Sequence, residues 1–410
     1  MKKHLRMDMS KRYKIIKVIL FSASLASLII LFKFFNKAVQ PNVIFITVDA
    51  LRPDHLSCYG YRRGTSPNID KLAKEGVTFL NCFATSSSTA YSAVGLFTGR
   101  YLMIGAEHDS FNNILDKKFT TLAEYFKNFG YFTAAFINNS LLRTGKGFEQ
   151  GFDYFYMDNS EYDAKKLTSP VLNFLLYKRP KNKPLFVWIH YMDAHVPYHF
   201  EEQYLKAFEE DSLYKENDRI LKLKPDNLEK DEFQQKWNSR GFIPPSVFQK
   251  NKYSLNYYIA RYDTAIIYID SQIGNLLKNM KDDTIIILTA DHGESLGEHN
   301  VYFAHGENIY DEVLHIPLII KDNRYFKGGQ RISKSVSNID IVPTILSRIN
   351  PIWYFFDKHK FDGIDLKQVG QNANLPRKYI YSYHPWAWSI RDINRNIKYI
   401  LNQNGEEELY

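Results

Sequence analysis

Unbroken apolar runs recur along this chain. They include residues 42–48 (NVIFITV), 184–190 (PLFVWIH) and 284–288 (TIIIL). Short runs rich in β-branched residues are typical of buried strands in a parallel sheet. Less regular apolar segments at 77–82, 131–137 and 316–320 predict further strands.

Helical periodicity fills the gaps between these runs. Apolar residues at three-to-four spacing from 255 to 277 predict a long amphipathic helix that leads into the 284–288 strand. Shorter helices are predicted at 66–76, 121–130 and 338–349. Alternating strands and helices predict an α/β fold, a doubly wound, mostly parallel sheet flanked by helices.

The remaining segments define the expected domain organisation. The catalytic domain is expected at residues 41–350, with a polar insertion at 199–252 that we interpret as a lid or substrate collar. Residues 351–410 are expected to form a subdomain with a small antiparallel sheet, because 378–383, 386–390 and 397–401 are strand-like.

Three of the apolar runs end in carboxylates. Asp49 follows the first, Asp193 and His195 follow the second, and Asp291 and His292 follow the third. In open α/β sheets, ligands bind beyond the carboxyl ends of the strands. Carboxylate oxygen beside imidazole is typical of a divalent transition-metal site.

The net charge of +8 is concentrated at the N-terminus. Residues 1–40 hold nine Lys and Arg and one Asp, a net charge of +8. The other 44 of the 53 bases and 44 of the 45 acids lie in residues 41–410, which are therefore neutral overall. This argues against nucleic acid as a partner.

The same N-terminal segment holds an uncharged apolar stretch at 18–32. We expect a transmembrane anchor at 15–35, with a basic cytoplasmic tail at 1–14, because no small-residue cleavage site follows the stretch. Seven bases precede the stretch and two follow it, which predicts a single-pass inner or plasma membrane protein with its catalytic domain outside the cytoplasm. An outward location permits a Cys58–Cys82 disulfide, but two unpaired thiols fit equally well.

Several short motifs occur together and in order between residues 42 and 410. They are VDALRPD (48–54), LSCYGY (56–61), SPNID (66–70), LFTGR (96–100), DHGE (291–294), GEH (297–299), HG (305–306), YDE (310–312) and the closing KYIL (398–401) and ELY (408–410). In these motifs the chain resembles the sulfatase family of the alkaline phosphatase superfamily.

The resemblance implies a nucleophile at Thr89, nine residues before the Thr of Thr-Gly-Arg. Formylglycine sulfatases carry Cys or Ser there, followed by Pro and Arg, where this chain has Tyr91 and Ala93. The resemblance is therefore closer to the phosphotransferase-like and phosphodiesterase-like members that use Thr.

By the same resemblance, Asp49, Thr89, Asp291 and His292 are expected to hold one divalent metal ion, with Mn or Zn favoured over Ca because of the imidazole. His195 and His305 are expected to be catalytic, binding the anionic group or protonating the leaving oxygen.

A second metal at Asp193, His195 and His305 is the alternative. We also expect Glu294 and His299 to orient His292.

Together these features predict a membrane-anchored, metal-dependent hydrolase or transferase. Its substrates would be phosphate or sulfate esters of cell-envelope lipids or glycans. One alternative is a sulfuric ester hydrolase that uses unmodified Thr89. Another is an inactive family member that acts as a binding protein.

Overall fold

The computed structural model describes residues 17, 40–101, 115–158, 162–199, 201–209, 211, 218–223, 241–371 and 377–410. The chain divides into two compact units, Met1–Pro41 and Asn42–Tyr410, and the second is described here. None of the helices within the described ranges is long and apolar enough to span a bilayer. The expected anchor at 15–35 lies outside the described residues, apart from Lys17.

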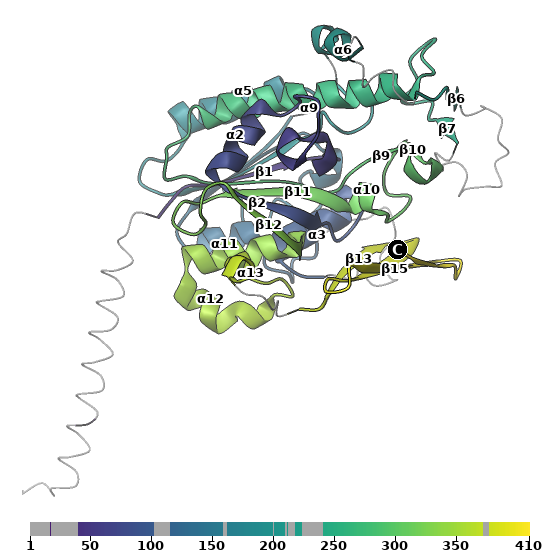
Figure 1. The fold of residues 1–410 in the computed structure, drawn as a ribbon. Coiled ribbons are helices and arrows are strands. Elements are labelled where there is room, and N and C mark those ends of the chain that lie inside the picture. Colours follow the sequence, from purple (N-terminus) through teal and green to yellow (C-terminus); the bar gives the residue numbers. More distant parts are fainter. Residues whose placement is uncertain are drawn as a thin grey trace, which may run out of the picture. The chain divides into compact units, whose positions relative to one another are not determined.

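The core of the second unit is an eight-stranded sheet in the order β12-β2-β11-β8-β1-β5-β3-β4 (Figure 1). Strands β8, β1, β5, β3 and β4 run parallel, and β11 is antiparallel to both of its neighbours. The expected α/β fold with a mostly parallel sheet is confirmed. The strands are β1 (Val43–Val48), β2 (Val77–Phe83), β3 (Phe132–Ile137), β4 (Tyr154–Met157), β5 (Leu185–Tyr191), β8 (Ile285–Ala290), β11 (His315–Lys321) and β12 (Gln330–Ser337).

Helices cover both faces of this sheet (Figure 1). One layer contains α2 (Pro67–Glu75), α5 (Ala164–Asn173) and α9 (Leu255–Leu277), and the other contains α3 (Thr89–Thr98), α4 (Leu122–Asn128) and α11 (Ile341–Ile349). The long helix expected at 255–277 is therefore present. The remaining helices are α6 (Glu202–Glu209), α10 (Asp311–Leu314), α12 (Pro351–Asp357) and α13 (Leu366–Gln371), with the 3₁₀ turns η1 (Pro53–His55), η2 (Ser57–Tyr59), η3 (Ser140–Leu142), η5 (Glu298–Asn300), η6 (Asn338–Asp340) and η7 (Lys358–Lys360) and the π-helix η4 (Phe174–Lys178).

Two strands of the sheet have no counterpart in the apolar pattern. β4 and β12 occupy the two outer positions of the sheet, and neither is an unbroken buried run. A strand at the edge pairs on one side only and buries less of its surface than a central strand. The apolar runs therefore mark the central strands and miss the outer ones.

The chain ends in a separate four-stranded antiparallel sheet, as expected. It consists of β13 (Tyr379–His384), β14 (Ala387–Asp392), β15 (Ile397–Asn402) and β16 (Glu407–Leu409). Short pairs β6 (Lys222–Leu223) with β7 (Phe242–Ile243) and β9 (Ser295–Leu296) with β10 (Tyr302–Ala304) complete the described strands. Cys58 and Cys82 are both free thiols, so the unpaired alternative is the correct one.

Candidate active site

The carboxyl ends of β1 and β8 bring two aspartates together. Val48 and Ala290 are paired in the parallel register, so the residues that follow them, Asp49 and Asp291, leave the sheet side by side. Ala50 then adopts a left-handed conformation at φ 58°, which costs about 1–2 kcal/mol in a non-glycine residue. Its amide donates to Asp291 Oδ1 at 3.3 Å, which ties the two strand ends together.

Asp49, Asp291 and His292 form a buried cluster whose ligand atoms all lie within 4.8 Å of one another. Asp49 Oδ1 and Asp291 Oδ2 have no hydrogen-bond partner among the described residues. His292 Nδ1 lies 2.9 Å from the Gly293 carbonyl oxygen, which can only accept, so Nδ1 carries the proton and Nε2 presents its lone pair. Two unpartnered carboxylate oxygens and one imidazole lone pair fit a divalent cation.

Thr89 faces this cluster from the first residue of α3. Its Oγ1 lies 3.1 Å from His292 Nε2 and 3.4 Å from Asp49 Oδ2, and the side chain is buried. Ser88 is the N-cap residue, so the Thr89 hydroxyl does not serve as a helix cap. The free N–H groups of the first turn of α3 start at this hydroxyl and favour negative charge there.

Two further side chains hold the Asp49 carboxylate. Asn139, which follows β3, donates from Nδ2 to Asp49 Oδ2 at 2.7 Å, and His190 Nε2 lies 3.2 Å from the same oxygen. Behind them, Trp188 Nε1 donates to Thr47 Oγ1 at 2.9 Å, and Thr47 Oγ1 lies 2.8 Å from His190 Nδ1. This chain of bonds places the His190 proton on Nε2 and leaves Asp49 Oδ1 free for a cation.

Neighbouring side chains shift the pKa values of Asp49 and His292 within the cluster. Although burial has the opposite effect, His195 and His190 hold the pKa of the Asp49 carboxyl well below its usual range. Likewise, Asp291 and Asp49 raise the pKa of His292 against the effect of burial. Asp49 is therefore ionised at neutral pH, as a metal ligand must be.

A row of imidazole rings borders the cluster. His292 stacks on His305 with ring centroids 4.3 Å apart, and His195 lies edge-on to His305 at 4.5 Å. His305 Nδ1 lies 3.1 Å from Glu294 Oε1. Burial lowers the pKa of His305 to about 3 and raises that of Glu294 to about 8, so the two groups form a neutral pair. His384 of β13 is also buried, and burial together with His305 and His292 lowers its pKa to about 4.

Asp193 is placed differently from the other predicted site residues. Its Oδ1 accepts from the Ala164 amide at 2.8 Å, at the first residue of α5. Burial raises the pKa of Asp193 to about 7. Asp193 thus lies at a helix N-terminus, and the cluster of potential ligands found in the described structure consists of Asp49, Asp291 and His292.

The expectation that Glu294 and His299 orient His292 was wrong, because Glu294 contacts His305 instead. The Gly293 carbonyl orients His292, as described above, whereas His299 Nδ1 lies 2.9 Å from Glu312 Oε1 and its ring stacks on Tyr310 at 3.7 Å. A backbone carbonyl next to the ligand is the simplest partner for its second ring nitrogen.

Comparison with known proteins identifies the family. The model of the Sulfatase family matches residues 41–350. The chain is 25% identical over 351 residues to the uncharacterized sulfatase YidJ of Escherichia coli K12, which covers 75% of this chain and 67% of that protein.

It is 27% identical over 415 residues to an N-acetylglucosamine-6-O-sulfatase of Bacteroides thetaiotaomicron, covering 82% of this chain and 70% of that protein. The phosphonate monoester hydrolase of Agrobacterium radiobacter has the same fold, with a TM-score of 0.69 at 19% identity over 90% of this chain and 89% of that one. The chain belongs to the sulfatase family, a family of hydrolases.

Proposed function

We propose that this protein is a membrane-anchored, metal-dependent hydrolase or transferase of phosphate esters, with Thr89 as its nucleophile. The observation that carries the proposal is the position of the Thr89 hydroxyl, 3.1 Å from His292 Nε2 and 3.4 Å from Asp49 Oδ2, at the first residue of α3. A divalent metal ion held by Asp49, Asp291 and His292 would supply the Lewis acidity that makes an alcohol a usable nucleophile.

The chain's own groups supply the rest of the chemistry. Asn139 and His190 fix the Asp49 carboxylate, so that its free oxygen stays directed at the cluster. The amides of the first turn of α3 stabilise negative charge on the group being transferred. The neutral pair of His305 and Glu294 can give a proton to the leaving oxygen. The product of the first step is an ester of Thr89, which water or an acceptor alcohol then cleaves.

We further propose that the substrate is a glycan or lipid of the cell envelope. The expected anchor at 15–35 and the outward orientation support this location. Beside the site, Tyr91 lies edge-on to Tyr383 with ring centroids 6.1 Å apart, and Tyr383 lies 6.0 Å from Trp388, which is 40% exposed. A row of aromatic faces leading from the Thr89 helix to solvent suits an extended sugar chain better than a single headgroup.

Sulfate-ester hydrolysis is the second candidate. It is favoured by the family and by the Bacteroides relative, which is an N-acetylglucosamine-6-O-sulfatase. Thr89 favours phosphate, because threonine does not yield the aldehyde that formylglycine sulfatases use. The third possibility, an inactive binding protein, is disfavoured by the unpartnered buried oxygens of Asp49 and Asp291.

The test uses the full chain in detergent with Mn or Zn and compares p-nitrophenyl phosphodiester, phosphomonoester and sulfate substrates. Thr89→Ala is expected to lower kcat/KM for the phosphodiester by at least about 10³-fold, whereas Thr89→Ser keeps measurable activity. The control is Thr98→Ala at the other end of α3, where the hydroxyl donates only to the Val94 carbonyl.

Full activity of Thr89→Ala would refute the assigned nucleophile. Faster release of sulfate than of phosphate would favour the second candidate. No turnover with either metal, and no metal retained after dialysis, would favour the binding protein.

A further inference from the structure

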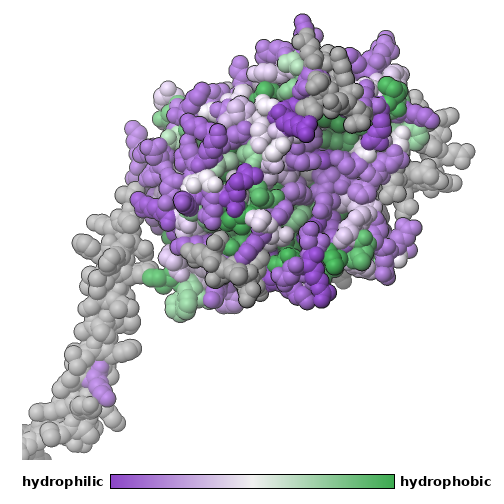
Figure 2. All heavy atoms as spheres, viewed as in Figure 1, coloured by the Kyte–Doolittle hydropathy of each residue, from purple (hydrophilic) through white to green (hydrophobic). Residues whose placement is uncertain are grey.

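Helix α12 exposes a row of large apolar side chains. Ile352, Phe355 and Phe356 are 49%, 65% and 68% exposed, and their spacing of three and four residues places them on one face of the helix. The other face is packed, since Trp353 lies 5.4 Å from the ring of Phe129. Hydrophobic atoms are visible at the lower left of Figure 2, where Figure 1 shows α12.

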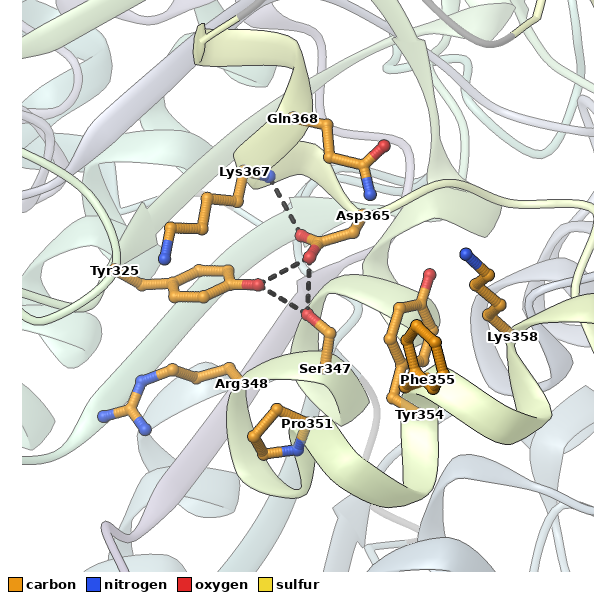
Figure 3. Close-up of a pocket in the computed structure, with 10 residues that line it drawn as sticks. All are labelled: Tyr325, Ser347, Arg348, Pro351, Tyr354, Phe355, Lys358, Asp365, Lys367 and Gln368. Atoms are coloured by element: carbon orange, nitrogen blue, oxygen red, sulfur yellow. Dashed lines mark hydrogen bonds between the residues drawn. The ribbon is translucent and has the colours of Figure 1, made fainter.

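Basic side chains lie next to this apolar face. A hollow of about 440 Å³ lies beside α12, and its lining includes residues of α11, α12 and α13, among them Lys367, together with Lys358 of η7 (Figure 3). Neither ammonium forms an ion pair with another described residue; Lys358 Nζ lies 5.5 Å over the Phe355 ring and Lys367 Nζ lies 4.4 Å over the Tyr325 ring. Asp365 is the one acidic residue in the lining, and it accepts hydrogen bonds from Tyr325 and Ser347. The hollow therefore presents positive charge directly beside exposed phenylalanines, which suits an anionic headgroup above apolar acyl chains.

The segment η4 also combines exposed apolar side chains with neighbouring basic residues. At the tip formed by η4, Leu176 is 49% and Tyr177 is 79% exposed. Lys178, Arg179, Lys181 and Lys183 follow, and residues 164–192 contain six Lys and Arg and no Asp or Glu. The segment before β8 adds two acids, Asp282 and Asp283, and two bases, Lys278 and Lys281, so it contributes no net charge.

Helix α12 and the η4 tip both lie at the edge of the sheet where the parallel strands begin. Leu176 and Asn42 line one hollow of about 150 Å³, and Asn42 is the residue directly before β1. On the other face of the sheet, α12 packs on Phe129, which closes the helix before β3, and the Phe132 amide at the start of β3 donates to the Pro184 carbonyl.

The site residues occupy the opposite edge of the same sheet, because they follow the carboxyl ends of the strands. Strands of six residues separate the two edges by about 20 Å.

We propose that this edge of the domain rests on an anionic bilayer, with α12 and the η4 tip in the headgroup region. The proposal rests on the membrane anchoring of the proposed function, because the apolar stretch at 18–32 ends eight residues before Gln40 and the chain enters this same edge at Asn42. Charge complementarity selects anionic lipid over a neutral surface. The active site then faces away from the bilayer and reaches groups that stand at least about 20 Å above it, which favours an extended glycan over a headgroup of the same membrane.

The test uses the full chain, with Cys58 and Cys82 changed to Ala, in vesicles of phosphatidylcholine and phosphatidylglycerol. A fluorophore is attached at Tyr177→Cys, and the matched control carries it at Asn404→Cys, in the exposed turn after β15. Lipids with a spin-labelled headgroup should quench the label at 177 at least about three-fold more than the label at 404. Phe355→Ser with Phe356→Ser should at least halve the quenching at 177, and Lys358→Glu with Lys367→Glu should reduce it in anionic vesicles only.

Equal quenching at both positions would overturn the proposal. The proposal would also be overturned if the label at 177 were not quenched while energy transfer between labelled copies rose with protein density. A second copy of the chain would then cover the exposed apolar side chains. A chain that fails to float with the vesicles overturns both the docking and the anchoring. None of these measurements uses turnover, so the outcome is independent of whether Thr89 is the nucleophile.

Discussion

Replacing Asn139 with Ala removes the shortest hydrogen bond that the Asp49 carboxylate receives. Asn139 Nδ2 donates to Asp49 Oδ2 at 2.7 Å, and Asn139 Oδ1 accepts from the Leu141 amide, which fixes the orientation of the side-chain amide. After the substitution, Asp49 Oδ2 keeps only the longer contacts to His190 at 3.2 Å and Thr89 at 3.4 Å. The carboxylate can then rotate, and Asp49 Oδ1 is no longer held toward the cluster.

The expected size of the effect follows from the kind of bond that is lost. A hydrogen bond to a charged group contributes about 1.5–3 kcal/mol, and removing the partner of a metal ligand typically costs about 10–100-fold in metal affinity. That factor corresponds to about 1.4–2.8 kcal/mol. We expect Asn139→Ala to raise the metal dissociation constant by this factor while kcat at saturating metal changes less than about three-fold.

Calorimetric titration of the apo-protein with Mn²⁺, alongside activity as a function of metal concentration, measures both quantities. The matched control is Asn138→Ala, since the Asn138 amide has no hydrogen-bond partner among the described residues. Unchanged metal affinity in Asn139→Ala would refute the positioning role. A large loss of kcat that persists at saturating metal would also refute it, because Asn139 would then act on the substrate.

Three further predictions test other parts of the site. Thr47→Val leaves Trp188 Nε1 and His190 Nδ1 without their partner and should lower the free energy of unfolding by about 2–4 kcal/mol, measured by denaturant titration. Trp388→Ala should raise KM for an oligosaccharide substrate at least about five-fold and leave KM for a p-nitrophenyl ester unchanged. Burial raises the pKa of Asp193 from 3.8 to about 7, so the folded state keeps a proton that the unfolded state loses, and stability falls as pH rises through this window. Asp193→Asn removes this group, so its stability relative to the wild type should increase between pH 4 and pH 7, and an unchanged difference would contradict the assignment.

The central cluster could be predicted from the sequence because parallel strands end at a common edge. Once residues 42–48 and 284–288 are recognised as neighbouring strand candidates, Asp49, Asp291 and His292 must emerge at the same side. The structure brings these three together with Thr89. Asp49 and Thr89 are 40 residues apart in the sequence, and this spacing does not predict their contact. Only the family motif indicated that Thr89 belongs to the site.

The supporting residues were missed for different physical reasons. Asn138 and Asn139 are the first two residues after β3, so the strand-end rule applied to neutral amides would have pointed to this pair without showing which of the two contacts Asp49. His190 lies inside an apolar run, and nothing in its neighbours marks it as a site residue. His384 reaches the site from the C-terminal sheet, a tertiary contact that neither periodicity nor spacing encodes.

Asp49 and Asp193 show why a carboxylate at a strand end is not sufficient evidence for a metal site. Both follow central parallel strands whose last residues, Val48 and Tyr191, are paired in register. Asp49 comes directly after its strand, where Asn139, His190 and Thr89 contact its Oδ2 and its Oδ1 faces the cluster. Asp193 comes one residue later, and its Oδ1 accepts from the backbone amide of the first residue of α5. The nearest unsatisfied donor decides the role of each aspartate, and only the folded chain shows which donor that is.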